Sequence, residues 1–204
     1  MDVSWDEALE AFEAAARWFV TTAAEVDGRW DAPGLGEWDV RALVGHTSRS
    51  LRTVEEYLAK PPDHVEIESA PLYYAATRAM AAGPGVAQRG RDAGQALGDQ
   101  PATAVAELAD RVVPLVRGCT GEELCTTIAG GMRLRDYLPT RTFELAVHTS
   151  DLCVALGLPL SVPASAARQA LQLVTELVVE DGLAGDALLA LTGRGPLPGG
   201  FSVM

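Results

Sequence analysis

Helical periodicity is the feature that most constrains the fold of this chain. Between Trp5 and Val26, apolar residues recur at intervals of three and four, and the same spacing returns between Val40 and Leu58. That spacing places apolar side chains on one face of an α-helix. Amphipathic helices must bury these faces against other elements, so the sequence predicts an all-α bundle.

Further helices follow from the same pattern and from glycine and proline punctuation. Two helices are expected between Ser69 and Gly98, separated at Gly83-Pro84-Gly85. A long helix should start near Arg135 or Asp136, accommodate Pro139 in its first turn, and end at Gly157. The remaining predicted helices span about residues 101–117, 163–179 and 183–191.

One short region interrupts the helical pattern. The stretch from Thr126 to Leu134 contains Gly130-Gly131 and predicts a short extended segment or hairpin, since glycines permit positive backbone dihedrals. The chain has 204 residues and is 48% hydrophobic, which suits one core. We therefore expect a single bundle domain over residues 1–204, with a Gly- and Pro-rich tail from about residue 193.

Charge and cysteine content exclude several classes of protein. A net charge of -12 repels phosphate and anionic lipids, so neither nucleic-acid nor membrane binding is expected. The three cysteines show no CxxC spacing and predict neither disulfides nor a thiolate zinc site. No apolar run has the roughly 18 residues of a membrane helix, and the N-terminus is acidic. We expect a cytoplasmic protein, and the oligomeric state stays open, a homodimer included.

A polar pair on the long helix gives the clearest indication of chemistry. Glu144 and His148 are spaced i and i+4, which places both side chains on one helix face. A carboxylate and an imidazole suit zinc, nickel or another first-row divalent ion. The same spacing also occurs as an ordinary hydrogen bond or ion pair. A metal site therefore requires a third ligand from another segment.

Two other histidines are candidates for that ligand. His64 follows Pro61-Pro62-Asp63 in an expected loop, where a solvated histidine is the usual finding. His46 lies on the core side of the helix that begins at Val40. It is either a metal ligand or a core histidine satisfied by a backbone carbonyl. Three protein ligands would leave a position for water or substrate, as in catalytic metal sites.

Two segments around these residues resemble one known family. Residues 30–51 read WDAPGLGEWDVRALVGHTSRSL, and residues 141–159 read RTFELAVHTSDLCVALGLP. Both are similar to signatures of the mycothiol-dependent maleylpyruvate isomerase family, within the wider DinB-like helical bundles. The closing GDALLALTGRGPLP also resembles the end of the N-terminal domain of this family.

The resemblance implies both a fold and a site. It implies a DinB-like four-helix bundle core, with the additional short helices and the hairpin outside it. It also implies a zinc or similar divalent ion held by His46, Glu144 and His148, which act in catalysis through the metal. A low-molecular-weight thiol, mycothiol, would be the co-substrate.

Charged residues near these segments are candidates to contact the thiol or an anionic substrate. Asp151 lies three residues past His148 and could orient that ring or contact the thiol. Guanidinium groups bind carboxylates in bidentate fashion, with surface ion pairs as the alternative role. The arginines concerned are Arg89, Arg91 and Arg141.

Two further residue types are expected mainly to pack. Cys153 is interpreted as a small core residue and not as a nucleophile. Trp30 and Trp38 frame the loop before the second helix, where they pack or form an aromatic rim beside the metal.

These expectations describe a divalent-metal-dependent transferase that activates a thiol for attack on a small electrophile. The resemblance implies that maleylpyruvate isomerase itself has two domains, of which the second helps to bind the substrate. The present sequence ends soon after the region that resembles the first domain. A thiol-dependent cis–trans isomerase of a maleylpyruvate-like substrate is therefore the second hypothesis. The third is a non-catalytic bundle that binds a small molecule or a partner protein, because fold does not determine function.

Overall fold

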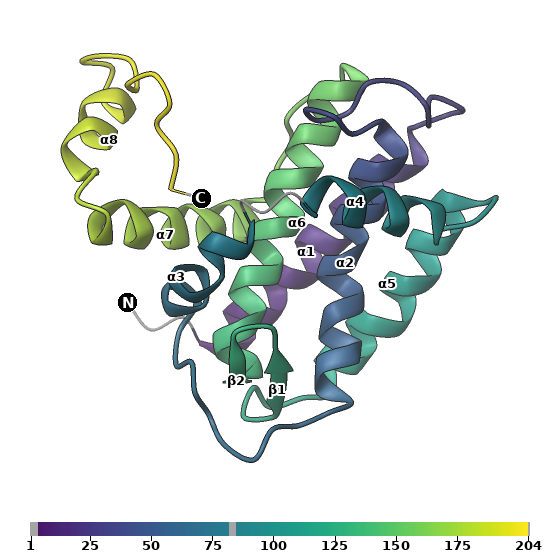
Figure 1. The fold of residues 1–204 in the computed structure, drawn as a ribbon, viewed down its shortest axis with the longest axis horizontal. Helices are drawn as coiled ribbons and strands as arrows, with labels where there is room; N and C mark the ends of the chain where they lie inside the picture. Colours follow the sequence, from purple (N-terminus) through teal and green to yellow (C-terminus); the bar gives the residue numbers. More distant parts are fainter. Residues whose placement is uncertain (1–3, 82–84, 204) are drawn as a thin grey trace.

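The computed structural model describes residues 4–81 and 85–203, and over these ranges it contains eight helices and one two-stranded hairpin (Figure 1). This confirms the prediction of an all-α bundle. The elements in chain order are α1 (Trp5–Ala24), α2 (Val40–Leu58), α3 (Ala70–Ala81), α4 (Val86–Gln95), α5 (Pro101–Arg117), β1 (Leu124–Thr127), β2 (Gly130–Arg133), α6 (Leu134–Leu156), α7 (Ala164–Glu180) and α8 (Ala184–Leu191).

Four helices form the core of the bundle. Helix α1 packs against α5 and α6, and α2 packs against the same two helices, so the four close a ring around one apolar interior. The apolar residues at three- and four-residue spacing fill this interior, as the periodicity predicts. Large side chains that are fully buried there include Phe12, Phe19, Leu43, Leu51, Leu138 and Leu145.

Local signals explain where these helices begin and end. Ser4 and Glu7 form a capping box at the start of α1. The side chain of Asp39 accepts a hydrogen bond from the Ala42 amide, which caps the free N–H groups of α2. Helix α6 ends at Gly157, which adopts the left-handed conformation with φ of 68°.

Two details differ from the sequence-based expectation. The hairpin begins at Leu124, and Gly130 and Gly131 belong to β2 and do not interrupt the strands. Helix α6 follows β2 directly and starts at Leu134, so Pro139 occupies its second turn and not its first. The predicted break between α3 and α4 falls partly on Gly83 and Pro84, which lie outside the described residues.

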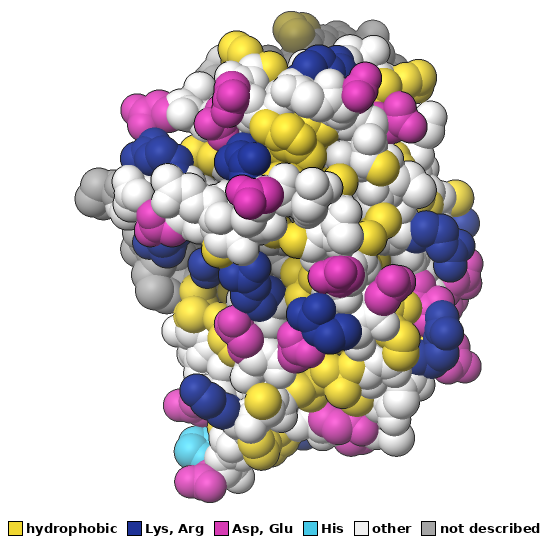
Figure 2. Space-filling view, turned by 90° about the vertical axis from the view of Figure 1, so that its right-hand side faces the viewer, with side chains coloured by type: hydrophobic (Ala, Val, Ile, Leu, Met, Phe, Trp, Pro, Cys, Tyr) yellow, Lys and Arg dark blue, Asp and Glu magenta, His cyan; other side chains and the backbone are white. Residues whose placement is uncertain are grey.

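The other helices surround the core. Helix α4 packs closely on α2, because Gly45 and Gly94 meet where a Cβ on Gly45 would lie 2.1 Å from the Gly94 nitrogen. Helix α3 contacts α6 and α7, and α8 contacts α7. No described helix is long and apolar enough to cross a membrane. On the face shown in Figure 2, acidic and basic side chains are interspersed.

Candidate metal centre

Helix α6 supplies two of the predicted ligands. Glu144 and His148 lie one turn apart, and the His148 Nε2 atom is 3.2 Å from the Glu144 Oε2 atom. Both side chains are largely shielded from solvent, with 18% and 16% of their surfaces exposed. The i,i+4 spacing therefore brings a carboxylate oxygen and an imidazole nitrogen together on a half-buried helix face.

A second polar group holds each of these two side chains. The Tyr74 hydroxyl of α3 donates to Glu144 Oε1 at 2.8 Å. Asp151 Oδ2 lies 3.0 Å from His148 Nδ1. These contacts leave Oε2 of the glutamate and Nε2 of the histidine directed at each other. Such partners fix the orientation and tautomer of metal ligands.

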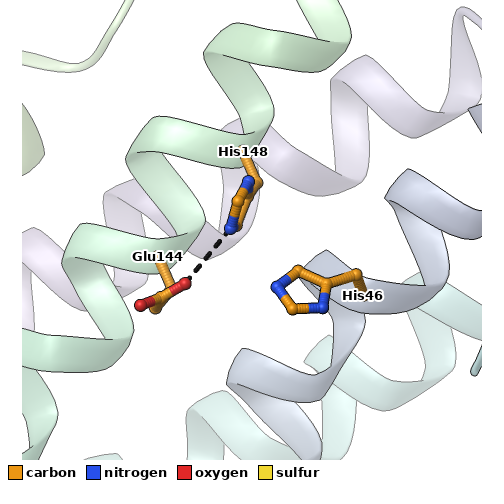
Figure 3. A group of neighbouring side chains, drawn as sticks. All are labelled: His46, Glu144 and His148. Atoms are coloured by element: carbon orange, nitrogen blue, oxygen red, sulfur yellow. Dashed lines mark ion pairs between the residues drawn. The ribbon is translucent and has the colours of Figure 1, made fainter. Parts of the chain in front are cut away.

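His46 approaches the pair from α2. Figure 3 shows its ring with one nitrogen directed toward Glu144 and His148. One ligand atom from each of the three residues lies within 4.8 Å of the others. The Trp38 ring stacks beside the His46 ring, with centroids 4.5 Å apart. The aromatic contact limits the freedom of the imidazole.

The alternative role of His46 as a satisfied core histidine receives no support. Its Nδ1 atom is buried and has no hydrogen-bond partner within residues 4–81 and 85–203. Nor does a backbone carbonyl in those ranges accept a hydrogen bond from this ring. Buried polar atoms usually find partners, so the described residues do not account for the burial of this nitrogen.

The separation of two of these atoms is compatible with a shared divalent ion. Ligand bonds of about 2.0–2.2 Å in a tetrahedral zinc site place two ligand atoms roughly 3.3 Å apart. The 3.2 Å between Glu144 Oε2 and His148 Nε2 is close to that value. The ligand atom of His46 lies within 4.8 Å of both. Two imidazoles and one carboxylate fit a first-row metal.

Burial and neighbouring charges shift the pKa values of the three residues in different directions. Burial favours neutral His148, but its hydrogen bonds to Asp151 and Glu144 prevail and raise its pKa to about 9. Burial likewise opposes the charge on Glu144, yet the hydrogen bond from His148 and the charge of Arg141 lower its pKa to about 2. Burial and the charge of His148 lower the pKa of His46 to about 4. At neutral pH the metal-free site therefore holds an ion pair beside a neutral imidazole.

The three ligand candidates lie in the wall of a cavity of about 790 Å³. Its walls come from α2, α3, α4 and α6, together with the loop before α2 and the tip of the hairpin. The lining residues are Leu35, Trp38, His46, Arg49, Ser50, Thr53, Tyr57, Tyr73, Tyr74, Thr77, Arg78, Gly85, Val86, Arg89, Ile128, Arg141, Glu144 and His148. A small organic molecule can therefore reach the three ligand candidates.

The structure separates the three predicted arginines. Arg141 is buried and Arg89 is exposed, and both line the cavity. Arg91 is absent from the lining and bonds to Gln88 on the surface of α4. Asp151 contacts His148 and is absent from the cavity lining.

The remaining candidates lie where packing or solvation accounts for them. Cys153 is buried, and His64 is exposed in a loop. Trp38 is buried against the cavity, whereas Trp30 is half-buried and lies under Arg41.

Sequence patterns did not assign two residues to the site. Tyr74 lies 70 positions from Glu144, and no spacing rule connects them. Arg49 lines the cavity one turn after His46, and its i+3 spacing from a predicted ligand was an available signal.

Comparison with known proteins identifies one matching family. The family model described as the mycothiol maleylpyruvate isomerase N-terminal domain matches residues 4–153. No curated protein and no solved structure gives a significant match. The matched residues include His46, Glu144 and His148, whereas α7 and α8 lie beyond the match.

Proposed function

Because the chain belongs to the mycothiol maleylpyruvate isomerase N-terminal domain family, we propose that it is a divalent-metal-dependent transferase that joins the sulfur of mycothiol to a small electrophile. One observation carries the proposal: His46, Glu144 and His148 converge on a single point in the wall of a cavity. Three ligands at a cavity leave room for a thiol, which a closed structural metal site does not.

These three residues would hold the ion, for which zinc is the first choice and nickel or another first-row ion the alternative. When bound, an ion with an open position favours the thiolate over the thiol at neutral pH. Tyr74 and Asp151 contact Glu144 and His148 and orient them without an ion present. The protein thus holds the donor atoms in place before a ligand arrives.

The cavity contributes positioning and exclusion of water. Aromatic side chains of Tyr73, Tyr74 and Trp38 form part of its wall and are themselves buried. In the proposed reaction a sulfur–carbon bond forms, the thiol proton leaves to solvent, and the displaced group departs with its electron pair. Holding both reactants in one cavity lowers the entropic part of the barrier.

The experiment compares two single-histidine variants prepared without chelators. We expect about one metal ion per chain by elemental analysis in the native protein and in His64→Ala, whose histidine is exposed and lies outside the cavity lining. His148→Ala should lose most of the metal and of the metal-dependent thiol consumption. Metal-free native protein, or an active and metal-loaded His148→Ala, would contradict the proposal.

The family description favours an isomerase as the second candidate. In an isomerase the thiol adds transiently and is released, so the total concentration of thiol stays constant while the substrate changes. A transferase consumes one thiol per product. Quantifying free thiol and product together over many turnovers therefore distinguishes the two reactions.

Calorimetry with mycothiol tests the non-catalytic alternative. Binding that requires the metal supports an enzyme of either kind. Thiol binding that is absent in both the metal-loaded and the chelator-treated protein would favour a bundle that binds another small molecule or a partner.

A further inference from the structure

We propose that a second cavity, between α3, α6 and α7, binds a small neutral molecule through a primary carboxamide group. The inference is independent of the metal centre and of the proposed reaction. It rests on the side chain of Gln169, which lies buried in the wall of this cavity with both amide atoms unpartnered among the described residues. The family match does not assign this site, because α7 lies beyond the matched residues 4–153.

The second cavity lies where three helices meet. Helix α7 contacts α6 and α3, and α3 also contacts α6 (Figure 1). The cavity has a volume of about 420 Å³. Sites for small organic molecules have volumes of roughly 300–1,000 Å³. No residue lines both this cavity and the one at the metal centre, so a ligand of one does not occupy the other.

Gln169 on α7 is a buried polar group that the fold leaves unsatisfied. Only 6% of its surface is exposed, and neither Nε2 nor Oε1 has a hydrogen-bond partner within residues 4–81 and 85–203. A flip of the amide, which exchanges the two atoms, does not supply a partner, because both positions lack one. Burial of an unpaired amide opposes folding, so its place in a cavity wall favours a ligand that provides the missing partners.

The unpartnered atoms define the group that would bind. Gln169 offers one N–H donor side and one carbonyl acceptor. A primary carboxamide is complementary, because its carbonyl accepts from Nε2 while one of its N–H groups donates to Oε1. Asp136 Oδ2, in the same lining, is buried and also lacks a hydrogen-bond partner in the described chain, since Arg133 Nη1 lies 3.7 Å away. This oxygen can accept the second N–H of the carboxamide.

The other charged residues of the lining already have partners on the protein. Arg135 pairs with Glu122. Glu176 accepts a hydrogen bond of 3.4 Å from Gln172. An ionic ligand would have to compete with these contacts, whereas Gln169 has none to lose. The lining therefore favours a neutral ligand over an ion.

Apolar residues indicate the rest of the ligand. Ala70 and Pro71 of α3, Pro139 of α6 and Leu173 of α7 form part of the cavity wall. A water molecule has a volume of about 30 Å³, a small part of this cavity, and it leaves such apolar surface uncovered. The expected ligand is thus a primary carboxamide with a compact apolar or aromatic body, and benzamide is the probe.

The test compares benzamide with acetophenone, in which a methyl group replaces the amide nitrogen and the carbonyl is kept. Two-dimensional NMR of the ¹⁵N-labelled full chain follows binding through the glutamine side-chain amides. We expect benzamide to bind at least tenfold more tightly and to shift an amide signal that Gln169→Met lacks. Gln169→Met should bind both probes equally. Gln95→Met is the matched control, because Gln95 is exposed at the end of α4 and lies outside the lining.

Thermal unfolding separates a ligand-binding glutamine from a structural one. Gln169→Met removes two unpartnered polar atoms and keeps an unbranched side chain of similar length. Its unfolding temperature should therefore equal or exceed that of the native protein. A glutamine that the fold requires would lower the unfolding temperature when it is replaced.

Four results would overturn the inference. These are equal affinity of the native protein for benzamide and acetophenone, a preference that survives Gln169→Met, a lower unfolding temperature of Gln169→Met, and a crystal structure grown with benzamide that shows only ordered water at Gln169. The comparison of the two probes on the native protein needs no variant. The assay contains no thiol, so a failure of the proposed transferase reaction would leave its outcome unchanged.

Discussion

Adding a divalent ion to the chelator-treated protein should release one proton at neutral pH. The proton comes from His148, whose pKa of about 9 keeps it charged in the metal-free protein. His46, with a pKa of about 4, and Glu144, with a pKa of about 2, are already deprotonated at pH 7. Metal ligation requires all three to be free of protons, so only His148 must lose one.

The magnitude follows from these values. With a pKa of about 9, His148 is about 99% charged at pH 7, so metal binding releases about one proton. The apparent affinity should rise about tenfold per pH unit between pH 5 and 8 and level off above pH 9. The change from pH 6 to pH 8 corresponds to about 2.7 kcal/mol of binding free energy. Below pH 4 the protonation of His46 adds a second proton.

Calorimetry in buffers of different ionisation enthalpy measures this number directly. The slope of the apparent binding enthalpy against the buffer enthalpy equals the number of protons released. Asp151→Asn supplies the control, because it removes a carboxylate that raises the pKa of His148. At pH 8 we expect the release to fall from about 0.9 to well below half a proton in this variant. A slope of zero or two for the native protein at pH 7 would refute the reasoning.

Further predictions concern the residues that position the site. Tyr74→Phe removes the hydrogen bond to Glu144 Oε1 and should weaken metal binding about tenfold. A competition with a chromophoric chelator measures this affinity. An unchanged affinity would show that the tyrosine does not orient the ligand. Gly45→Val places a side chain where α2 meets Gly94, and we expect a loss of about 3 kcal/mol in urea unfolding. Gly185→Val is the control, since a Cβ there meets no atom within 4 Å, and its effect should stay within about 0.5 kcal/mol. Equal stability of the two glycine variants would argue against the close helix contact.

Local interactions determined the helices, and the sequence therefore predicted them well. Helix α2 begins and ends at Val40 and Leu58, as its apolar spacing predicts, and the structure shows Asp39 as its cap. Gly157 ends α6 where a left-handed residue was expected. Capping and periodicity depend on neighbours within one or two turns, which a single sequence contains. For the same reason the i,i+4 relation of Glu144 and His148 was visible before the fold was known.

Only the tertiary structure decided which other side chains meet this pair. It brought Tyr74 against Glu144 across 70 positions, and it turned Arg89 toward the cavity and Arg91 toward solvent. Side chains two positions apart on a helix point in different directions, as those of Arg89 and Arg91 do. The packing of α4 on α2 determines which of the two faces the cavity. The sequence alone contained the metal-ligand candidates, because they follow from spacing and resemblance. The cavity beside them depends on packing between helices distant in the chain, which spacing rules do not encode.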